Sequence, residues 1–349
     1  MTNPFLDIVQ GKQAHRPAVW FMRQAGRVLP RYQQLRQNHS FLELMTQPDL
    51  AAKVTLLPID DLGVDAAILF SDILVIPMAM QSNVEWTDKG PVFPTPLAFV
   101  KNPSTLLKPQ PEKLEFVYRA IDHIIETRTP GTPLIGFCGA PLTTLCYMLQ
   151  GLNSHAGFPD AIKFFYTQPE ESRKLVDAIT ELCIHYARQQ VRHGIDVFQI
   201  FDTHAGLVPT ELYTELFLPA VKRITEAVRS MECRVIFFPK GIGTGLPLIT
   251  PEVCDIVSID WQTSLKTARQ QLHPSIGLQG NLDPRLLYAD SETIQASLDT
   301  YKRFFEQHGA WIFNLGHGVL ADTPFENLKA VATWVKTFST SQITEYTKL

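Results

Sequence analysis

The sequence lacks the features that mark membrane, secreted and nucleic-acid-binding proteins. No apolar stretch approaches the roughly 18 residues that a bilayer-spanning helix needs. The first five residues do not have the charged and apolar regions of a signal peptide. The formal net charge is −4 and there is no long basic block, which argues against a nucleic-acid partner. We therefore expect a soluble, cytoplasmic protein that binds neither membranes nor nucleic acids.

Cysteine is scarce. Five cysteines are an odd number, and none of them has Cys-x-x-Cys spacing, as is typical of a reducing compartment. Nothing in the sequence around Cys138 or Cys146 would lower the pKa of its thiol. We expect both to be unreactive packing residues.

Several common catalytic motifs are also missing. The sequence has no Gly-x-x-x-x-Gly-Lys-Ser/Thr loop, no Gly-x-Ser-x-Gly elbow and no His-Glu-x-x-His helix. The glycine-rich run at 240–245 follows an apolar segment and could cradle phosphate, but its spacing fits no established fingerprint, and we interpret it as an ordinary loop. Asp202, His204 and His317 could converge as metal ligands, yet no ligand spacing supports that set, and we expect no metal site.

What the chain does contain is a repeating pattern of strands and helices. Of its 349 residues, 45% are hydrophobic and 19% charged, enough to form a large core. Continuous apolar runs, typical of strands covered on both faces, predict strands at 18–22, 66–70, 134–137, 197–201, 235–238, 256–259, 276–278 and 311–315. Helical patterns separate them at 50–62, 114–128, 169–193, 210–231, 264–272, 291–308 and 324–336. This alternation predicts one α/β domain, a closed (β/α)₈ barrel and not an open doubly wound sheet.

In such barrels the active site lies at the carboxyl ends of the strands. Polar residues and glycines follow every predicted strand, at 22–27, 71–72, 138–141, 202–206, 239–241, 260–261, 279–284 and 316–318. One such strand end would mean little. Eight of them predict a functional mouth at one end of the barrel.

Two arginines stand out at this mouth. Arg23 and Arg27 follow the first strand four residues apart, and Arg31 and Arg36 come soon after. The planar guanidinium group is always charged and pairs with carboxylate or phosphate through two parallel hydrogen bonds. The cluster predicts a site for a polyanionic small molecule, although a solvated basic turn is the simpler alternative.

Other candidates occupy the remaining strand ends. Asp72 is an isolated carboxylate that should lie at the rim of the barrel interior, or else cap a helix. Tyr147 lies in a helical pattern, where an aromatic is usually part of the core. His317 lies between two glycines, with little bulk to bury it, and is the histidine that we most readily interpret as functional. His204 could equally make a structural hydrogen bond to a neighbouring loop.

The motifs together resemble those of uroporphyrinogen decarboxylases, which remove the acetate carboxyl groups of a cyclic tetrapyrrole on the way to haem and chlorophyll. The matching segments occur in the family's order between about residues 17 and 330. They are WFMRQAGR at 20–27, FSDIL at 70–74, GFCGAP at 136–141, FDTHAG at 201–206, LQGNLDP at 278–284 and NLGHG at 314–318. The resemblance implies a distorted (β/α)₈ barrel, a homodimer, and a reaction without metal or organic cofactor that converts uroporphyrinogen III to coproporphyrinogen III.

The resemblance also implies residue roles. An electron-rich pyrrole can serve as its own electron sink, so the protein must stabilise a cation at the macrocycle centre and anions at its edge. Asp72 would hydrogen-bond the pyrrole N–H groups, and Arg23 and Arg27 would bind the peripheral carboxylates. One of these arginines is also a candidate for proton delivery, although a pKa above about 12 makes arginine a poor general acid. The further implied substrate-binding residues are Arg36, Tyr147, Thr203 and His317.

Departures from the family pattern remove no charged group implicated in the chemistry. Family members usually have an aromatic residue at position 28 and an acid near position 31, where this chain has Val28 and Arg31. Leu142 stands where a tryptophan is frequent, and Ala321 replaces a common proline.

Two other classes stay open. Corrinoid- or thiol-linked methyltransferases share the fold, but they generally need a His-x-Cys and a distant Cys for zinc, which this sequence lacks. A non-catalytic tetrapyrrole carrier would need the arginines but not Asp72. The polar C-terminal segment, 337–349, is expected to fray.

Overall fold

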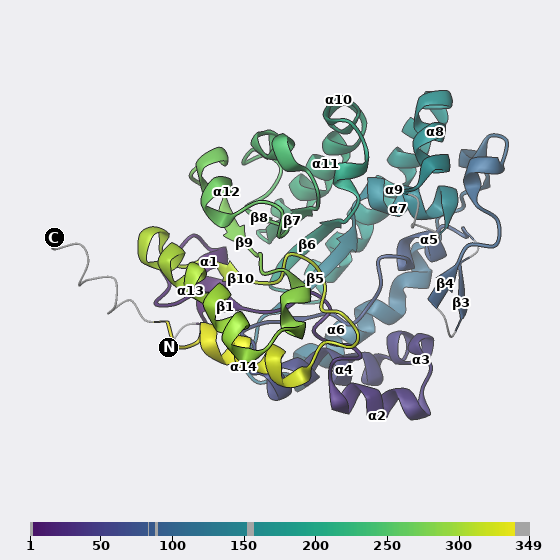
Figure 1. Cartoon of the computed structure of the whole chain (residues 1–349). Helices are drawn as coiled ribbons and strands as arrows, with labels where there is room; N and C mark the ends of the chain where they lie inside the picture. The colour runs from purple at the N-terminus through teal and green to yellow at the C-terminus, as the bar shows by residue number, and fades with distance from the viewer. Residues whose placement is uncertain (1–2, 83, 88–89, 152–156, 339–349) are drawn as a thin grey trace.

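All eight predicted strands are present and form one parallel sheet. The computed structural model describes residues 3–82, 84–87, 90–151 and 157–338. The sheet has the order β1-β10-β9-β8-β7-β6-β5-β2, and it curls so that its two ends approach each other (Figure 1). The strands are β1 (Ala18–Val19), β2 (Ala67–Ile68), β5 (Leu134–Gly139), β6 (Val197–Asp202), β7 (Arg234–Pro239), β8 (Ile256–Ser258), β9 (Gly277–Gln279) and β10 (Ile312–Phe313). The expectation of a distorted (β/α)₈ barrel is confirmed.

The distortion lies at the seam between β1 and β2. Within the described residues no strand ladder joins these two strands. Instead, the Asp65 N–H donates to the Val19 carbonyl at 2.7 Å, and Asp65 Oδ2 accepts from the Val19 N–H at 2.8 Å. Arg16 binds the same carboxylate through two hydrogen bonds of 2.6 and 2.8 Å. A buried ion pair thus closes the barrel where the sheet does not.

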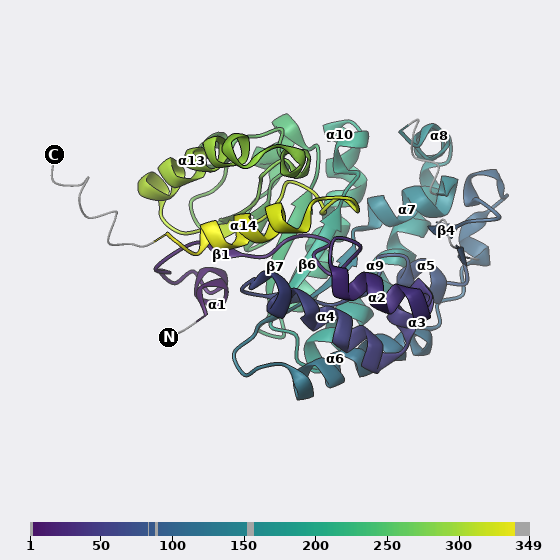
Figure 2. The ribbon, with the colours of Figure 1, turned by 60° about the horizontal axis from the view of Figure 1, so that its bottom comes forward.

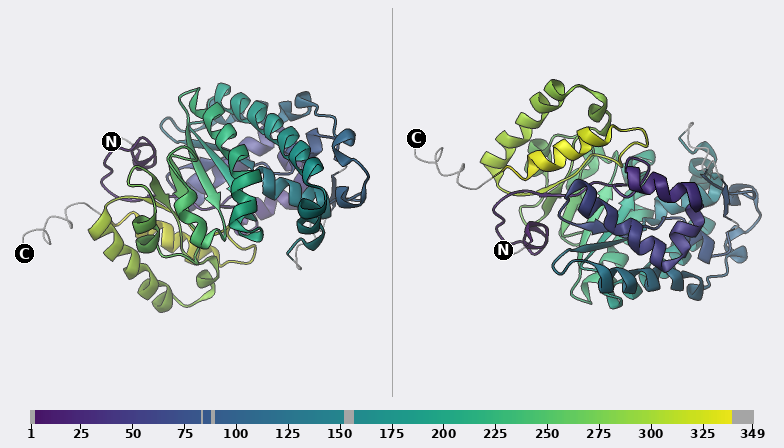
Figure 3. Two further views of the ribbon diagram at one scale, coloured as in Figure 1. Left: turned by 90° about the horizontal axis from the view of Figure 1, so that it is seen from above. Right: turned by 90° about the horizontal axis from the view of Figure 1, so that it is seen from below.

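Helices cover the outside of the curled sheet (Figure 2). Six match the predicted patterns closely: α4 (Pro48–Leu62), α6 (Glu115–Thr127), α9 (Pro169–Arg192), α12 (Leu265–Gln271), α13 (Ser291–His308) and α14 (Phe325–Val335). A seventh, α11 (Leu218–Arg229), covers the second part of its predicted pattern. Figure 3 shows α9 and α11 side by side. The predicted helix at 210–231 is in fact divided into α10 (Thr210–Leu212), a π-helical turn (Tyr213–Phe217) and α11. Pro219 has no N–H to donate to the preceding turn, which explains the interruption.

Apart from the helical pattern around Tyr147, which belongs to α7, the sequence patterns did not reveal the shorter elements. These are α1 (Pro4–Val9), α2 (Pro30–Asn38), α3 (Phe41–Thr46), α5 (Val75–Ala79), α7 (Pro141–Gln150), α8 (Pro159–Thr167) and the hairpin of β3 (Glu85–Thr87) and β4 (Gly90–Val92). Short 3₁₀ turns occur at Leu97–Phe99, Pro103–Leu106, Pro111–Leu114, Ala205–Leu207, Gly243–Leu248 and Pro284–Tyr288. Four of the helices begin with proline, a start signal that is visible in the sequence.

The barrel interior is polar at its centre. The Trp20 indole donates to Gln279 Oε1 at 3.0 Å, and Gln279 Nε2 donates to Gln199 Oε1 at 3.2 Å. All three side chains are fully buried, so the hydrogen bonds offset the cost of placing amides there.

The described chain stays packed to its last residue, and it contains no helix long and apolar enough to cross a membrane. Phe338 is buried against Trp334, with ring centroids 4.6 Å apart. The rest of the segment expected to fray, 339–349, lies outside the described residues.

Candidate active site

The turn that carries Arg23 is tied to both neighbouring strand ends. The Met22 N–H donates to Asn314 Oδ1 at 3.0 Å, and the Met22 carbonyl accepts from the Val319 N–H at 2.8 Å. Gln24 Nε2 donates to the carbonyl of Ala66, just before β2, at 3.0 Å. The side chain of Arg23 therefore starts from a backbone fixed between β10 and β2.

Arg23 itself is exposed and has an unusual backbone conformation. Its φ of 61° lies in the left-handed region, which is costly for a residue with a Cβ. Its side chain extends over Gly318, because a Cβ built there would lie only 2.3 Å from Arg23 Cδ. The glycine after His317 thus makes room for the arginine.

Asp72 follows β2 and is half-buried. Its Oδ1 accepts from the Leu74 N–H at 2.8 Å, whereas no hydrogen bond to Oδ2 occurs within the described residues. The helix cap considered above is not its role, because α5 has Leu74 at its N-cap position. Burial raises the pKa of Asp72, and the Leu74 N–H and the charge of Arg23 oppose this rise. The result is a carboxylate beside a guanidinium group with one oxygen available.

Tyr147 and His204 form a pair at the same mouth. The Tyr147 hydroxyl and His204 Nε2 lie 3.0 Å apart, and both rings contact Phe158. Burial raises the pKa of Tyr147 to about 12, while the charge of Arg23 opposes the rise. Burial lowers the pKa of His204 to about 4, helped by the charge of Lys240. His204 therefore makes a hydrogen bond within the protein, to a tyrosine on helix α7 and not to the neighbouring loop that we considered.

His317 is a neutral donor. Its Nδ1 accepts from the Gly318 N–H at 2.6 Å, so the proton of the neutral ring is on Nε2. Burial lowers the pKa of His317 to about 3, and the charges of Arg23 and Lys240 lower it further. Because the ring is uncharged at neutral pH, it offers one N–H and no positive charge to a ligand.

Asp202 does not join the two histidines in a metal site. Its Oδ1 accepts from the Thr143 hydroxyl at 2.6 Å and its Oδ2 from the Tyr213 hydroxyl at 2.8 Å. Burial raises the pKa of this carboxyl to about 6. No group of three possible metal ligands occurs in the part of the chain that the structure describes. Thr203, the next residue, is half-buried between Asp202 and His204.

The remaining arginines divide into two groups. The charges of Arg36 and Arg27 both oppose the rise in pKa that burial causes at Tyr32, so both lie near this residue of α2. Arg31 instead pairs with Asp61 at 2.8 Å and with Asp60 at 3.3 Å. Arg31 is thus already paired with two carboxylates of α4, exposed Asp60 and largely buried Asp61.

Two other interpretations from the sequence agree with the structure. Cys138 and Cys146 are buried, and burial raises the pKa of both thiols well above the ordinary value. In the glycine-rich loop, the Gly241 N–H donates to Asp260 Oδ2 at 2.5 Å and so is not available to a phosphate.

Comparison with known proteins identifies the family of this chain. The family described as uroporphyrinogen decarboxylase (URO-D) matches residues 1–338. The chain belongs to this family. A uroporphyrinogen decarboxylase from Geobacter metallireducens is 40% identical over 94% of this chain and 96% of its own. One from Pelobacter propionicus is 39% identical over 98% of this chain and 100% of its own.

A solved structure shares the fold of this chain. A methyltransferase from Methanosarcina mazei superposes with a TM-score of 0.75 at 22% identity, covering 96% of this chain and 98% of its own. A likeness at this identity concerns the fold alone.

The family resemblance did not single out Lys240, which lies at the same mouth. Lys240 follows β7, and its Nζ lies 5.4 Å from the centroid of the Trp261 ring. Its effect on the pKa of both His204 and His317 places its charge beside the two histidines. Its position directly after an apolar strand was a visible signal, which we set aside with the glycine-rich loop.

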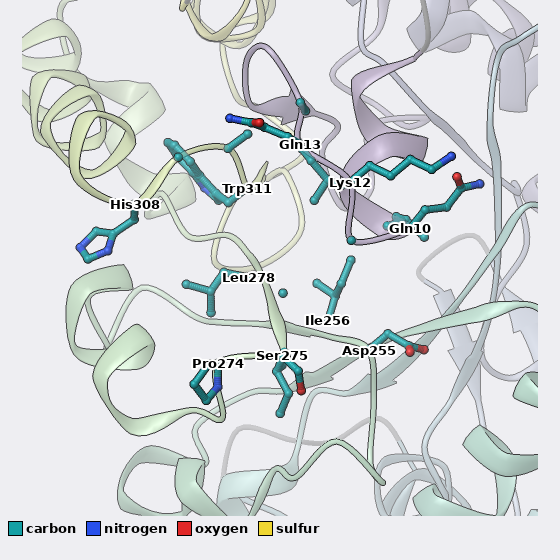
Figure 4. A pocket seen from close by; sticks show the side chains of 18 of the residues that line it. Gln10, Lys12, Gln13, Asp255, Ile256, Pro274, Ser275, Leu278, His308 and Trp311 are labelled. Carbon is teal, nitrogen blue, oxygen red and sulfur yellow. The ribbon is translucent and has the colours of Figure 1, made fainter. Parts of the chain in front are cut away.

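A large cavity at the other end of the barrel does not compete with this site. It has a volume of about 610 Å³ and lies where β7, β8 and β9 begin, between them and the N-terminal segment that includes Lys12 (Figure 4). Its Arg234 is paired with Asp255 at 2.8 Å. The guanidinium group of Arg269 donates to three backbone carbonyls. The two arginines that line the cavity are thus already engaged within the protein.

Proposed function

We propose that this chain carries out the reaction of its family with Asp72 as the central catalytic residue. The substrate is uroporphyrinogen III, whose four acetate side chains become methyl groups to give coproporphyrinogen III. One observation supports the proposal above all others. Asp72, whose Oδ1 accepts from the Leu74 N–H, follows β2 at the barrel mouth, and its charge interacts with those of Arg23 and Tyr147.

Decarboxylation needs an electron sink that accepts the electron pair of the bond to the departing carboxylate. A proton adds to the pyrrole ring carbon next to the one bearing the acetate, which gives an iminium-like cation. The bond between the methylene and the carboxylate then breaks, its electron pair enters the ring, and CO₂ leaves. A second proton on the exocyclic carbon completes the methyl group while the ring loses the first. The balance for each acetate is one carboxylate and one proton converted to one methyl group and one CO₂.

The proposed role of Asp72 follows from this charge distribution. Its free oxygen would accept hydrogen bonds from the pyrrole N–H groups and stabilise the positive charge that develops on the ring. A cationic macrocycle favours the ionised carboxylate and so counters the effect of burial on the pKa of Asp72. Preorganised charge is worth most in a site that excludes water.

The edge of the macrocycle would be bound by cations and neutral donors. We assign its carboxylates to Arg23, Arg27 and Arg36, with Arg23 or Arg27 also a candidate for proton delivery. The further binding residues are Tyr147, Thr203 and His317. The neutral donors would fix the orientation of a carboxylate that the cations attract, because each hydrogen bond requires a defined geometry.

The family resemblance also bears on the oligomeric state, the compartment and the cofactor requirement. We expect a homodimer in the cytoplasm, acting on its substrate without metal or organic cofactor. The pyrrole supplies the electron sink that a cofactor would otherwise provide.

The test is an anaerobic incubation of purified, chelator-treated protein with uroporphyrinogen III. After oxidation, chromatography separates the porphyrins by their number of carboxyl groups. Stepwise loss of four carboxyls is the expected result. Unchanged substrate in the presence of folded protein would contradict the proposal and favour a tetrapyrrole carrier.

A further inference from the structure

Lys240 carries a positive charge that the protein does not neutralise. No ion pair to this lysine occurs within the described residues, although many other lysines and arginines there are paired. Its side chain is half-buried. A cation held partly out of water without a counter-ion is unfavourable unless a ligand supplies the negative charge.

The backbone of Lys240 is firmly held. Its N–H donates to the Asp202 carbonyl and its carbonyl accepts from the Gly206 N–H, both at 3.0 Å. The loop after β6 packs closely on the loop after β7, because a Cβ on Gly206 would lie 2.2 Å from the Gly241 carbonyl oxygen. The side chain therefore extends from a fixed point at the end of β7.

Trp261 provides an internal comparison between two cations. Lys240 Nζ lies 5.4 Å and Arg285 Cζ 5.2 Å from the centroid of its ring, both within the range of a cation–π interaction. Arg285 is neutralised by Asp283, through hydrogen bonds of 2.9 and 2.6 Å. Lys240 has only the ring. The two cations thus share one aromatic support and differ in whether an acid pairs with them.

Lys240 also lies on the same side of the site as His317. Both contact Trp261, whose ring centroid lies 5.4 Å from Lys240 Nζ and 6.4 Å from the centroid of the His317 ring. The charges of Arg23 and Lys240 also lower the pKa of the imidazole. Arg27 and Arg36, in contrast, lie near Tyr32 on α2. The mouth consequently has a positive group after β7 in addition to those that follow β1.

We propose that Lys240 is a further substrate-binding residue, which holds a peripheral carboxylate of the tetrapyrrole at the β7 side of the mouth, next to the His317 N–H. This inference rests on the proposed function. Uroporphyrinogen carries a carboxylate-bearing acetate and propionate on each of its four rings, so anions surround the macrocycle. All four acetates must reach one Asp72 in turn, and a cation at β7 would hold whichever ring lies there.

The test compares Lys240→Met with Arg285→Met. Methionine keeps most of the apolar stem of either side chain and removes its charged end. We expect Lys240→Met to raise the KM for uroporphyrinogen III about tenfold, the loss of one charge-assisted hydrogen bond, with kcat within about twofold. Lys240→Arg should restore most of the affinity. Arg285→Met should change KM by less than about twofold.

A structural role would give a different pattern. If Lys240 only supported Trp261, Lys240→Met and Arg285→Met would lower the unfolding midpoint alike and affect KM alike. Equal KM values for the wild type and Lys240→Met would overturn the proposal, as would failure of Lys240→Arg to restore binding.

Binding of oxidised uroporphyrin, followed by fluorescence, separates this proposal from the proposed function. In one outcome the wild type does not decarboxylate, but Lys240→Met still binds uroporphyrin about tenfold more weakly than Arg285→Met. The proposed decarboxylase function is then contradicted and the Lys240 carboxylate site is supported. If the wild type is active and both variants bind uroporphyrin and turn over as it does, the Lys240 site alone fails.

Discussion

The side chain of Arg23 lies against the α-carbon of Gly318. A methyl group at position 318 would lie 2.3 Å from Arg23 Cδ and 2.7 Å from Cγ, closer than any real contact. The loop after β10 therefore does more than present His317. It also leaves open the space through which Arg23 reaches the mouth.

Gly318→Ala should accordingly impair catalysis without unfolding the protein. The added methyl would push Arg23 out of its position beside Asp72, and we expect kcat/KM to fall at least about tenfold. The control is a double-mutant cycle with Arg23→Ala. In that background no Cγ or Cδ remains to be displaced, so adding Gly318→Ala should change kcat/KM by less than about twofold. Full additivity of the two losses would contradict the proposed contact.

Asp72→Asn should separate binding from turnover. The amide keeps the size of the side chain and can still accept from the Leu74 N–H, but it cannot stabilise a cationic pyrrole by charge. We expect kcat to fall by about 10² to 10³, as when a preorganised electrostatic group is lost, with uroporphyrin affinity within about threefold. Asp60→Asn, on the exposed surface of α4, is the matched control and should behave as the wild type. Full turnover by Asp72→Asn would exclude the proposed role.

Asp202 should make stability depend on pH. Its pKa is about 6 in the folded protein and about 3.8 ordinarily, so between pH 4 and 6 the folded state holds a proton that the unfolded chain has lost. The free energy of unfolding should therefore decrease as pH rises through this window, by up to about 3 kcal/mol. Asp202→Asn removes this titration.

Urea unfolding of both proteins between pH 4 and 7 measures the effect. The difference in free energy of unfolding, wild type minus Asp202→Asn, should fall as pH rises. Other titrating groups, including His204 and His317, contribute equally to both proteins and cancel. A difference that does not vary with pH would show that the Asp202 carboxyl is not perturbed.

Breaking the seam of the barrel should be far more costly than breaking a surface ion pair. Asp65→Ala leaves the Arg16 guanidinium group without its acid, with only the Pro17 carbonyl to bind, and the Val19 N–H without its acceptor, in a largely buried setting. We expect a loss of about 3–5 kcal/mol in the free energy of unfolding. Arg173→Ala removes exposed ion pairs with Glu170 and Glu215 and should cost less than about 1 kcal/mol. Denaturant titration of both variants tests the contrast, and similar losses would show that the seam does not depend on Asp65.

The strands were predictable because most are continuous apolar runs between polar residues. This pattern survives in a single sequence, so β5 to β7 were found within one or two residues. Short helices such as α2 carry no clear period. The π-helical turn at Tyr213 depends on a single proline inside an otherwise regular pattern.

The candidate site was partly visible in the sequence for a related reason. Asp72 and His317 could be found because strand ends meet at one edge of a barrel. What the sequence did not reveal were relationships between side chains from distant elements. Whether Arg31 or Lys240 has an acidic partner depends on α4 in one case and on the loops around Trp261 in the other. Such pairing depends on the directions in which the side chains point, and a single sequence does not show these directions.

The seam between β1 and β2 has a consequence for catalysis. Arg23 follows one of these strands and Asp72 follows the other, so the proposed reacting groups straddle the joint where no ladder fixes the spacing. Their separation is set by Asp65 and by Gln24, through contacts that individual substitutions can loosen. In a barrel closed by a ladder on every side, changing that distance would require shifting an entire strand. Here a few side chains set it, and the seam is the natural place to alter how large a ring the mouth accepts.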